Sequence, residues 1–281
     1  MTRSALPAGE MRVLALAVDG TVLTDGDVLT GATVEAIGKV KRAGVRVILT
    51  SARPPARLRD VQRRLGIEAE VFVACQGALV GRRSEGGGLE ILCEARIDPE
   101  KALSLEDRAL DRGLSVSRFI GDQWLVRGID AAVLQEAAIS GLDPEVLTGD
   151  ALHPDMAPHK LVVSCGRDAD QSALQQYRRE LPFSIKGAFS SPTRLEVTDH
   201  QIDKASGLRA ALSGLGVHLN QTAGIWACDN DISMLKAVGY SFAMDNASDD
   251  VRNIATWVTW RNVDDGVAWA IDQLLAQSSS Y

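Results

Sequence analysis

Largely apolar segments that alternate with helical patterns dominate the first 80 residues of the chain. Residues 13–18 form an uninterrupted apolar run, and residues 45–50 and 71–75 have a similar character. Such runs are typical of strands in a parallel sheet whose two faces are covered by helices. Helical spacing begins after Thr30, a favourable N-cap, and again near residue 56. This alternation predicts an α/β fold with a doubly wound parallel sheet.

The pattern changes after a glycine-rich polar segment at residues 81–90. Short strands and helices follow, with a hairpin expected at Gly121-Asp122, and they indicate an inserted α+β unit. The α/β rhythm resumes near residue 194. We therefore predict three segments that make two domains: a core from 1–82 and 189–281, and an inserted domain from 83–188.

Composition excludes several classes of protein. The net charge of −7 over 281 residues argues against nucleic acid and anionic membranes as main partners. Apolar runs are too short to span a membrane, and the first ten residues lack the apolar segment of a secretory signal. Four cysteines without CxxC spacing are typical of free thiols in a reducing compartment. We expect a cytoplasmic protein; its oligomeric state has no readable signal.

Polar residues stand where several predicted strands end, which is where α/β sheets bind ligands. Asp19 follows the first strand, Ser51 follows the second, and residues 229–231 (Asp-Asn-Asp) follow a later one. Lys204 lies in the first turn of a predicted helix, where a cation opposes the helix dipole unless an anion is nearby. These positions form a candidate anion site, although turns and N-caps favour the same residue types.

Four motifs in order resemble the haloacid dehalogenase (HAD) superfamily and, more narrowly, its Cof-type sugar-phosphatase branch. They are "VDGTVL", "ILTSARPP", "LEVTDHQIDKASGLRAAL" and "CDNDISMLKAVGYSFAMDNASDDVRNIATWVT". In addition, "VACQGALV" resembles that branch's Asn-Gly-Ala segment, with Gln76 in place of Asn. The resemblance implies a Rossmann-like core with a C2-type cap inserted in it. The implied ancestral activity is Mg²⁺-dependent hydrolysis of small phosphorylated metabolites such as sugar phosphates.

The resemblance also assigns roles. The family's first motif is Asp-x-Asp-Gly-Thr, whose first Asp attacks phosphorus and whose second is the general acid and base. Asp19 matches the second Asp, whereas the nucleophile position is Ala17. The other implied site residues are Thr21, Ser51 and Lys204 for the phosphate, Asp229 and Asp231 for the metal, and Gly20, Arg53 and Asn230 in support.

Two departures from the family's motifs change the expected activity. Ala17 has a methyl group, which neither attacks phosphorus nor binds Mg²⁺. The last motif normally reads Gly-Asp-x-x-Asn-Asp, but here it is the shorter Cys228-Asp-Asn-Asp. We therefore expect phosphoryl transfer to be lost or severely impaired and the Mg²⁺ site to be weakened.

Several alternatives remain open at this point. The chain is either an impaired phosphatase, a non-catalytic protein that binds phosphate or another anion, or a repurposed enzyme that uses Asp19 as general acid or base. An engineered inactive variant of an active phosphatase would also carry Ala17. Cys228 is either a nucleophile in a repurposed site or a packed thiol. In the cap, Trp124 and Arg127 are candidates to face the substrate, although strand alternation places them on opposite sides.

Overall fold

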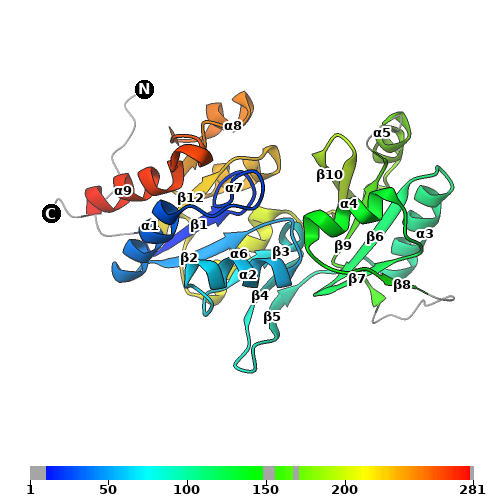
Figure 1. Ribbon diagram of the computed structural model, residues 1–281, viewed down its shortest axis with the longest axis horizontal. Coiled ribbons are helices and arrows are strands. Elements are labelled where there is room, and N and C mark those ends of the chain that lie inside the picture. Colours follow the sequence, from blue (N-terminus) through cyan, green and yellow to red (C-terminus); the bar gives the residue numbers. More distant parts are fainter. Residues whose placement is uncertain (1–10, 148–155, 167–170, 279–281) are drawn as a thin grey trace.

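Two β-sheets, each with its own helices, lie side by side along the long axis of the molecule (Figure 1). This architecture comes from a computed structural model that describes residues 11–147, 156–166 and 171–278. Among these residues, every helix is too short or too polar to cross a bilayer.

The first sheet has eight strands in the order β14-β13-β12-β1-β2-β3-β4-β5. Its strands are β1 (Val13–Ala17), β2 (Arg46–Thr50), β3 (Phe72–Ala74), β4 (Leu79–Arg83), β5 (Leu89–Glu94), β12 (Thr222–Trp226), β13 (Tyr240–Ala243) and β14 (Trp257–Val258). Pairing is parallel from β14 to β3 and antiparallel from β3 to β5. The predicted parallel α/β core is confirmed.

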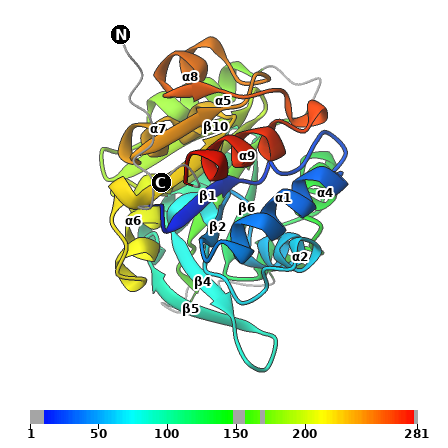
Figure 2. The ribbon, with the colours of Figure 1, turned by 90° about the vertical axis from the view of Figure 1, so that its left-hand side faces the viewer.

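Helices cover both faces of this sheet. They are α1 (Gly31–Arg42), α2 (Pro55–Leu65), α6 (Lys204–Gly214), α7 (Ile232–Ala237), α8 (Asp249–Ile254) and α9 (Gly266–Ser278). The α6 helix lies on one side of the central strands and α1 and α2 lie on the other (Figure 2). Helix α1 begins as expected, because the Thr30 side chain accepts a hydrogen bond from the Thr33 N–H.

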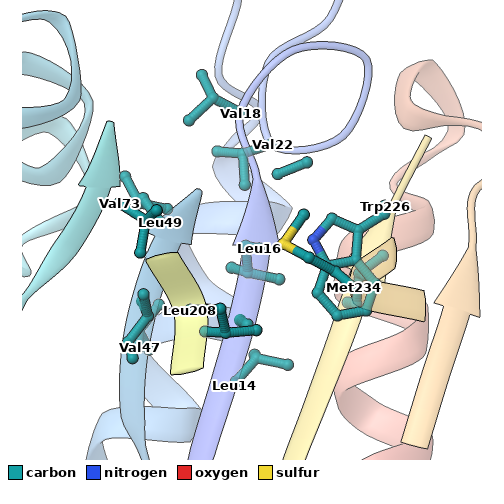
Figure 3. Close-up of a cluster of buried hydrophobic side chains, with 14 of the residues drawn as sticks. Leu14, Leu16, Val18, Val22, Val47, Leu49, Val73, Leu208, Trp226 and Met234 are labelled. Carbon is teal, nitrogen blue, oxygen red and sulfur yellow. The ribbon is translucent and has the colours of Figure 1, made fainter. Parts of the chain in front are cut away.

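The core of the first sheet forms around β1, whose five residues are all buried. Leu14 and Leu16 pack near Trp226 and Met234 (Figure 3). Full burial of one such leucine stabilises the fold by about 1.5–3 kcal/mol. Gly224 leaves room for the indole, because a Cβ there would lie 2.0 Å from the Trp226 ring. This packing fixes the carboxyl ends of β1 and β12 next to each other.

Within the described ranges, the second sheet has six strands in the order β10-β11-β9-β6-β7-β8. Its strands and helices are α3 (Pro99–Leu110), β6 (Ser115–Ile120), β7 (Gln123–Val126), α4 (Ala131–Ser140), β8 (Glu145–Val146), β9 (Lys160–Ser164), α5 (Ser172–Arg179), β10 (Ile185–Ser191) and β11 (Arg194–Asp199). The hairpin expected at Gly121-Asp122 is present, since Ile120 pairs with Gln123 across that turn. This mixed unit is the α+β insertion expected from the sequence, and we call it the cap.

The chain passes from one sheet to the other at positions that differ from the domain boundaries expected at 82/83 and 188/189. Strand β5 belongs to the first sheet, because residues 84–88 form a turn that folds it back on β4. Strands β10 and β11 belong to the second sheet, where β11 pairs with β9. The pattern missed this because antiparallel hairpins extend a sheet without a crossover helix.

Candidate functional site

A cavity of about 540 Å³ lies between the first sheet and the cap. Its floor contains Ala17, Asp19, Ser51, Arg53 and residues 227–231, which stand at the carboxyl ends of β1, β2 and β12, together with Lys204 of α6. The structure therefore brings together most of the residues that the sequence singled out. Gly20 and Thr21 are not among those that line the cavity.

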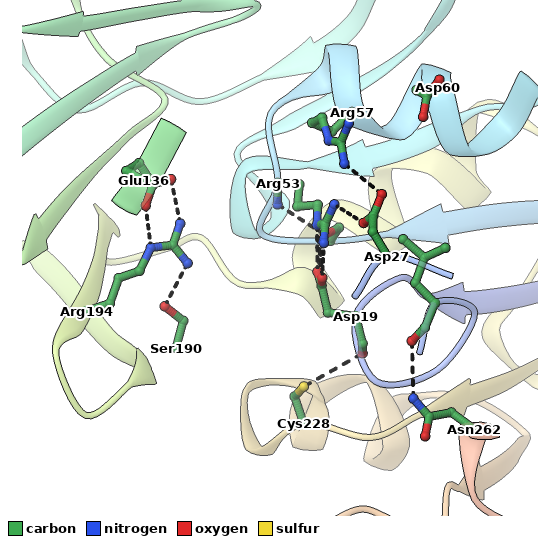
Figure 4. A network of polar contacts seen from close by, with 12 residues as sticks. Asp19, Asp27, Arg53, Arg57, Asp60, Glu136, Ser190, Arg194, Cys228 and Asn262 are labelled. Atoms are coloured by element: carbon green, nitrogen blue, oxygen red, sulfur yellow. Dashed lines mark hydrogen bonds and ion pairs between the residues drawn. The ribbon is translucent and has the colours of Figure 1, made fainter. Parts of the chain in front are cut away.

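Asp19 is held by Arg53 (Figure 4). The carboxylate accepts hydrogen bonds from Arg53 Nε at 2.9 Å, and Arg53 Nη2 lies 2.6 Å from Oδ1. The other end of the guanidinium contacts Asp27 at 2.9 Å. Burial opposes the charge on Arg53, but Asp19 and Asp27 outweigh it and raise the pKa of Arg53 above its usual value. Asp19 therefore carries its own counter-ion, supplied by the chain.

Lys204 projects from the first turn of α6, whose N-cap is Asp203. Its Nζ donates to Asp231 Oδ1 at 2.6 Å and to Asn230 Oδ1 at 2.9 Å. Asp231 is fully buried, and Lys204 is 5% exposed. Burial favours the neutral amine, but Asp231 outweighs it and raises the pKa of Lys204. This ammonium, which carries three donors, faces the cavity with two of them already engaged by the 229–231 turn.

Cys228 lies beside the carbonyl of Asp19. Its Sγ is 4.0 Å from that oxygen, and its N–H donates to Asp231 Oδ2 at 3.1 Å. Burial and the nearby Asp231 raise the pKa of the Cys228 thiol to about 11. A thiol that stays protonated is a poor nucleophile. Cys228 is half-buried and lines the cavity, but its raised pKa argues against the nucleophile alternative.

The remaining predicted residues lie around this centre. Ser51 Oγ is 3.4 Å from Asp19 Oδ2 and accepts a hydrogen bond from Arg53 N–H. Asp229 lines the cavity and accepts a hydrogen bond from Ser248 Oγ.

Gly20 adopts a positive φ of 66°, and its carbonyl accepts a hydrogen bond from Asn246 Nδ2 at 2.9 Å. Thr21 is buried, and its hydroxyl has no partner within the described part of the chain.

The cap supplies the opposite wall of the cavity, which the sequence patterns missed. Arg194 Nε and Nη2 donate to the two oxygens of Glu136 at 2.6 and 2.8 Å, and Nη1 donates to Ser190 Oγ (Figure 4). Strand alternation along β11 was the available signal, but it does not say which face meets the core. The predicted alternatives in the cap do not line the cavity: Trp124 is buried against Phe119, and Arg127 pairs with Asp107.

A family model for haloacid dehalogenase-like hydrolases matches residues 14–271. The chain belongs to this family. Relatives of similar length include a putative phosphatase of Streptococcus pyogenes, 25% identical over 93% of this chain and 97% of its own. A 5-amino-6-(5-phospho-D-ribitylamino)uracil phosphatase of Bacillus subtilis is 24% identical over 95% of this chain and 99% of its own. These matches support the Cof-type branch.

Solved structures of the family share the fold. A haloacid dehalogenase-like hydrolase from Bacteroides thetaiotaomicron superposes with a TM-score of 0.84 at 24% identity and covers 94% of this chain and 99% of its own. A subclass IIB sugar phosphatase superposes with a TM-score of 0.77 at 18% identity, with the same coverage. The overall fold of this chain is therefore that of solved HAD-family proteins.

The cap wall of this HAD protein makes its stability sensitive to acid. Glu196 is fully buried between Lys160 and Arg194. Burial raises its pKa, but these two cations outweigh burial, so the pKa of Glu196 lies below its usual range. A lowered carboxyl pKa adds stability above the unfolded-state pKa, and this stability is lost as pH falls through the folded-state pKa. We expect the melting temperature to fall as the pH drops below about 4.3, the ordinary value for an unfolded-state glutamate.

Thermal melts above and below this pH check this expectation. Glu196→Gln should flatten the decrease, because glutamine does not titrate. Glu90→Gln is the matched control, since Glu90 forms an exposed ion pair with Arg82 and should leave the decrease nearly as in the wild type. An unchanged slope in Glu196→Gln would contradict the assignment.

Proposed function

We propose that this chain binds small phosphorylated metabolites between core and cap and has lost the usual phosphoryl transfer of its family. The observation that carries the proposal is the chemistry of two side chains that line the cavity, Ala17 and Cys228. A methyl group stands where the family has its nucleophile, and a protonated thiol lies beside the Asp19 carbonyl. Neither group forms an aspartyl phosphate.

The same residues do not fit the Mg²⁺ ion that the family implies. Mg²⁺ takes oxygen ligands in near-octahedral geometry. Ala17 offers none, Cys228 offers a soft sulfur, and both oxygens of Asp231 are engaged by Lys204 and the Cys228 N–H. Across the described residues, no group of three or more His, Cys, Asp or Glu side chains is arranged to hold a metal ion. We infer that these residues bind Mg²⁺ only weakly.

Two other residues of the cavity, Ser51 and Lys204, support binding of an anion. Ser51 supplies a hydroxyl, Lys204 supplies a buried ammonium, and both line the cavity. A charge-assisted hydrogen bond to phosphate is about twice as strong as a neutral one. Two of the three donors of Lys204 are engaged by Asp231 and Asn230, which leaves one for an anion in the cavity of about 540 Å³.

The repurposed-enzyme alternative has less support. A general base needs a carboxylate oxygen that reaches the substrate, whereas Arg53 contacts both oxygens of Asp19.

Phosphatase assays test the proposal. With p-nitrophenyl phosphate and a panel of sugar phosphates, we expect no turnover above background with or without Mg²⁺. Isothermal titration should nevertheless detect binding of inorganic phosphate. Robust Mg²⁺-dependent turnover would overturn the loss of activity, and absence of phosphate binding would overturn the binding role.

A further inference from the structure

A second cavity of about 180 Å³ adjoins the first and shares Lys204, Asp229 and Asn230 with it. Gln76 lines it from the core, and Lys186, Glu196 and Thr198 line it from the cap strands. Lys204 is therefore part of the wall of both cavities. A ligand whose anionic group contacts Lys204 in the larger cavity lies next to the smaller one.

Gln76, which lines this cavity, has a buried hydrogen-bond donor without a partner among the described residues. Its side chain is 6% exposed, and the donor is Nε2. Buried amide groups in folded proteins are nearly always paired, and an unpaired one costs stability. Gln76 also has a positive φ of 61°, a conformation that a non-glycine residue seldom adopts. Backbone strain and an orphaned donor at one residue are typical of a functional position.

The backbone holds Gln76 between two members of the candidate phosphate site. Its N–H donates to the Ser51 carbonyl at 3.2 Å, and the N–H of Cys75 donates to the Arg53 carbonyl at 3.1 Å. On the other side, a Cβ at residue 77 would lie 2.1 Å from the Asp203 carbonyl, so only glycine permits this close approach. The backbone of Gln76, from which the amide side chain projects, is thus fixed relative to both Ser51 and the first turn of α6.

Lys186 and Glu196, the charged groups that the cap strands contribute to the smaller cavity, already have partners. Lys186 Nζ lies 3.2 Å from Asp203 Oδ2. Glu196 is paired with Lys160 at 2.7 Å and with Arg194 at 3.0 Å. A second phosphate would have to break these pairs, whereas a neutral hydroxyl or carbonyl oxygen would not. The donor that needs a partner is the neutral amide.

We propose that Gln76 is a specificity-determining residue that donates a hydrogen bond to a hydroxyl or carbonyl oxygen on the uncharged body of the bound metabolite. The inference rests on the proposed function, because Ser51 and Lys204 hold the anionic group of the same ligand. The ligand class is a phosphorylated compound whose uncharged body carries acceptor oxygens. Gln76 discriminates against phosphates that have an apolar body.

Gln76→Met tests this role, because it should raise the melting temperature and lower the affinity for the ligand. Methionine removes the orphaned donor, so the ligand-free protein should melt at a higher temperature than the wild type. Titration calorimetry with glucose 6-phosphate, ribose 5-phosphate and glycerol 3-phosphate should show about tenfold weaker binding of whichever one the wild type prefers. Inorganic phosphate and phenyl phosphate should bind both proteins equally.

Gln62→Met is the matched control. Gln62 is also buried, and its Oε1 lacks a partner among the described residues, but its Nε2 donates to the Glu70 carbonyl at 2.8 Å and it lines neither cavity, so Gln62→Met should leave all affinities unchanged. If Gln76→Met fails to fold, Gln76→Ala serves for the affinity readout. A lower melting temperature with unchanged affinities, or no preference of the wild type over phenyl phosphate, would overturn the inference. Failure of inorganic phosphate to bind the wild type would instead overturn the proposed function.

Discussion

Lys204→Met lowers the free energy of unfolding by about 3–5 kcal/mol, because it leaves the carboxylate of Asp231 buried without its cation. Asp231 is fully buried and lies 2.6 Å from Lys204 Nζ. Removal of one partner of a buried pair is costly, since the other charge is neither hydrated nor paired. Urea unfolding measures the change.

Two further variants isolate the cause. Asp231→Leu combined with Lys204→Met removes both charges and should recover most of the lost stability. Lys39→Met is the surface control, because the Lys39–Asp272 pair is 40% and 52% exposed and should contribute at most about 1 kcal/mol. Equal losses in Lys204→Met and Lys39→Met would show that the buried pair is not the source.

Ala17→Asp by itself yields no Mg²⁺-dependent phosphatase activity and destabilises the protein by about 2–4 kcal/mol. Ala17 is 2% exposed at the floor of the cavity, so the new carboxylate enters a partly enclosed space that Asp19, Asp229 and Asp231 already line. The nearest cation of the family's mechanism, Lys204, is already bound by Asp231 and Asn230. Cys228 remains beside the Asp19 carbonyl. Turnover of p-nitrophenyl phosphate and urea unfolding measure the two effects.

Ala17→Asn is the control, because asparagine has nearly the size of aspartate but carries no charge. It should destabilise less than Ala17→Asp, because a buried amide costs less than a buried carboxylate. Full recovery of Mg²⁺-dependent turnover by Ala17→Asp would contradict the proposed loss of function. It would instead identify the chain as an inactivated variant of a working phosphatase.

The core of the fold could be predicted because its signals are local. The apolar run that became β1, the Thr30 N-cap and the Gly121-Asp122 turn each depend on residues close in sequence. The positions of Asp19, Ser51 and residues 229–231 followed from one rule about strand ends. Membership of β5, β10 and β11 in their sheets could not be predicted, because it depends on pairing between segments that are distant or hairpin-linked.

The sequence by itself determined the HAD fold, the methyl group at residue 17 and the shortened last motif, because these are matters of residue type and spacing. The tertiary structure decided which charges meet. It paired Asp19 with Arg53 and Lys204 with Asp231, placed Cys228 beside the Asp19 carbonyl, and brought the cap wall opposite them. It also left Gln76 Nε2 buried without a partner in the described chain. Hydrogen bonding and burial depend on distances of a few ångströms between segments far apart in sequence, and only the folded chain sets those distances.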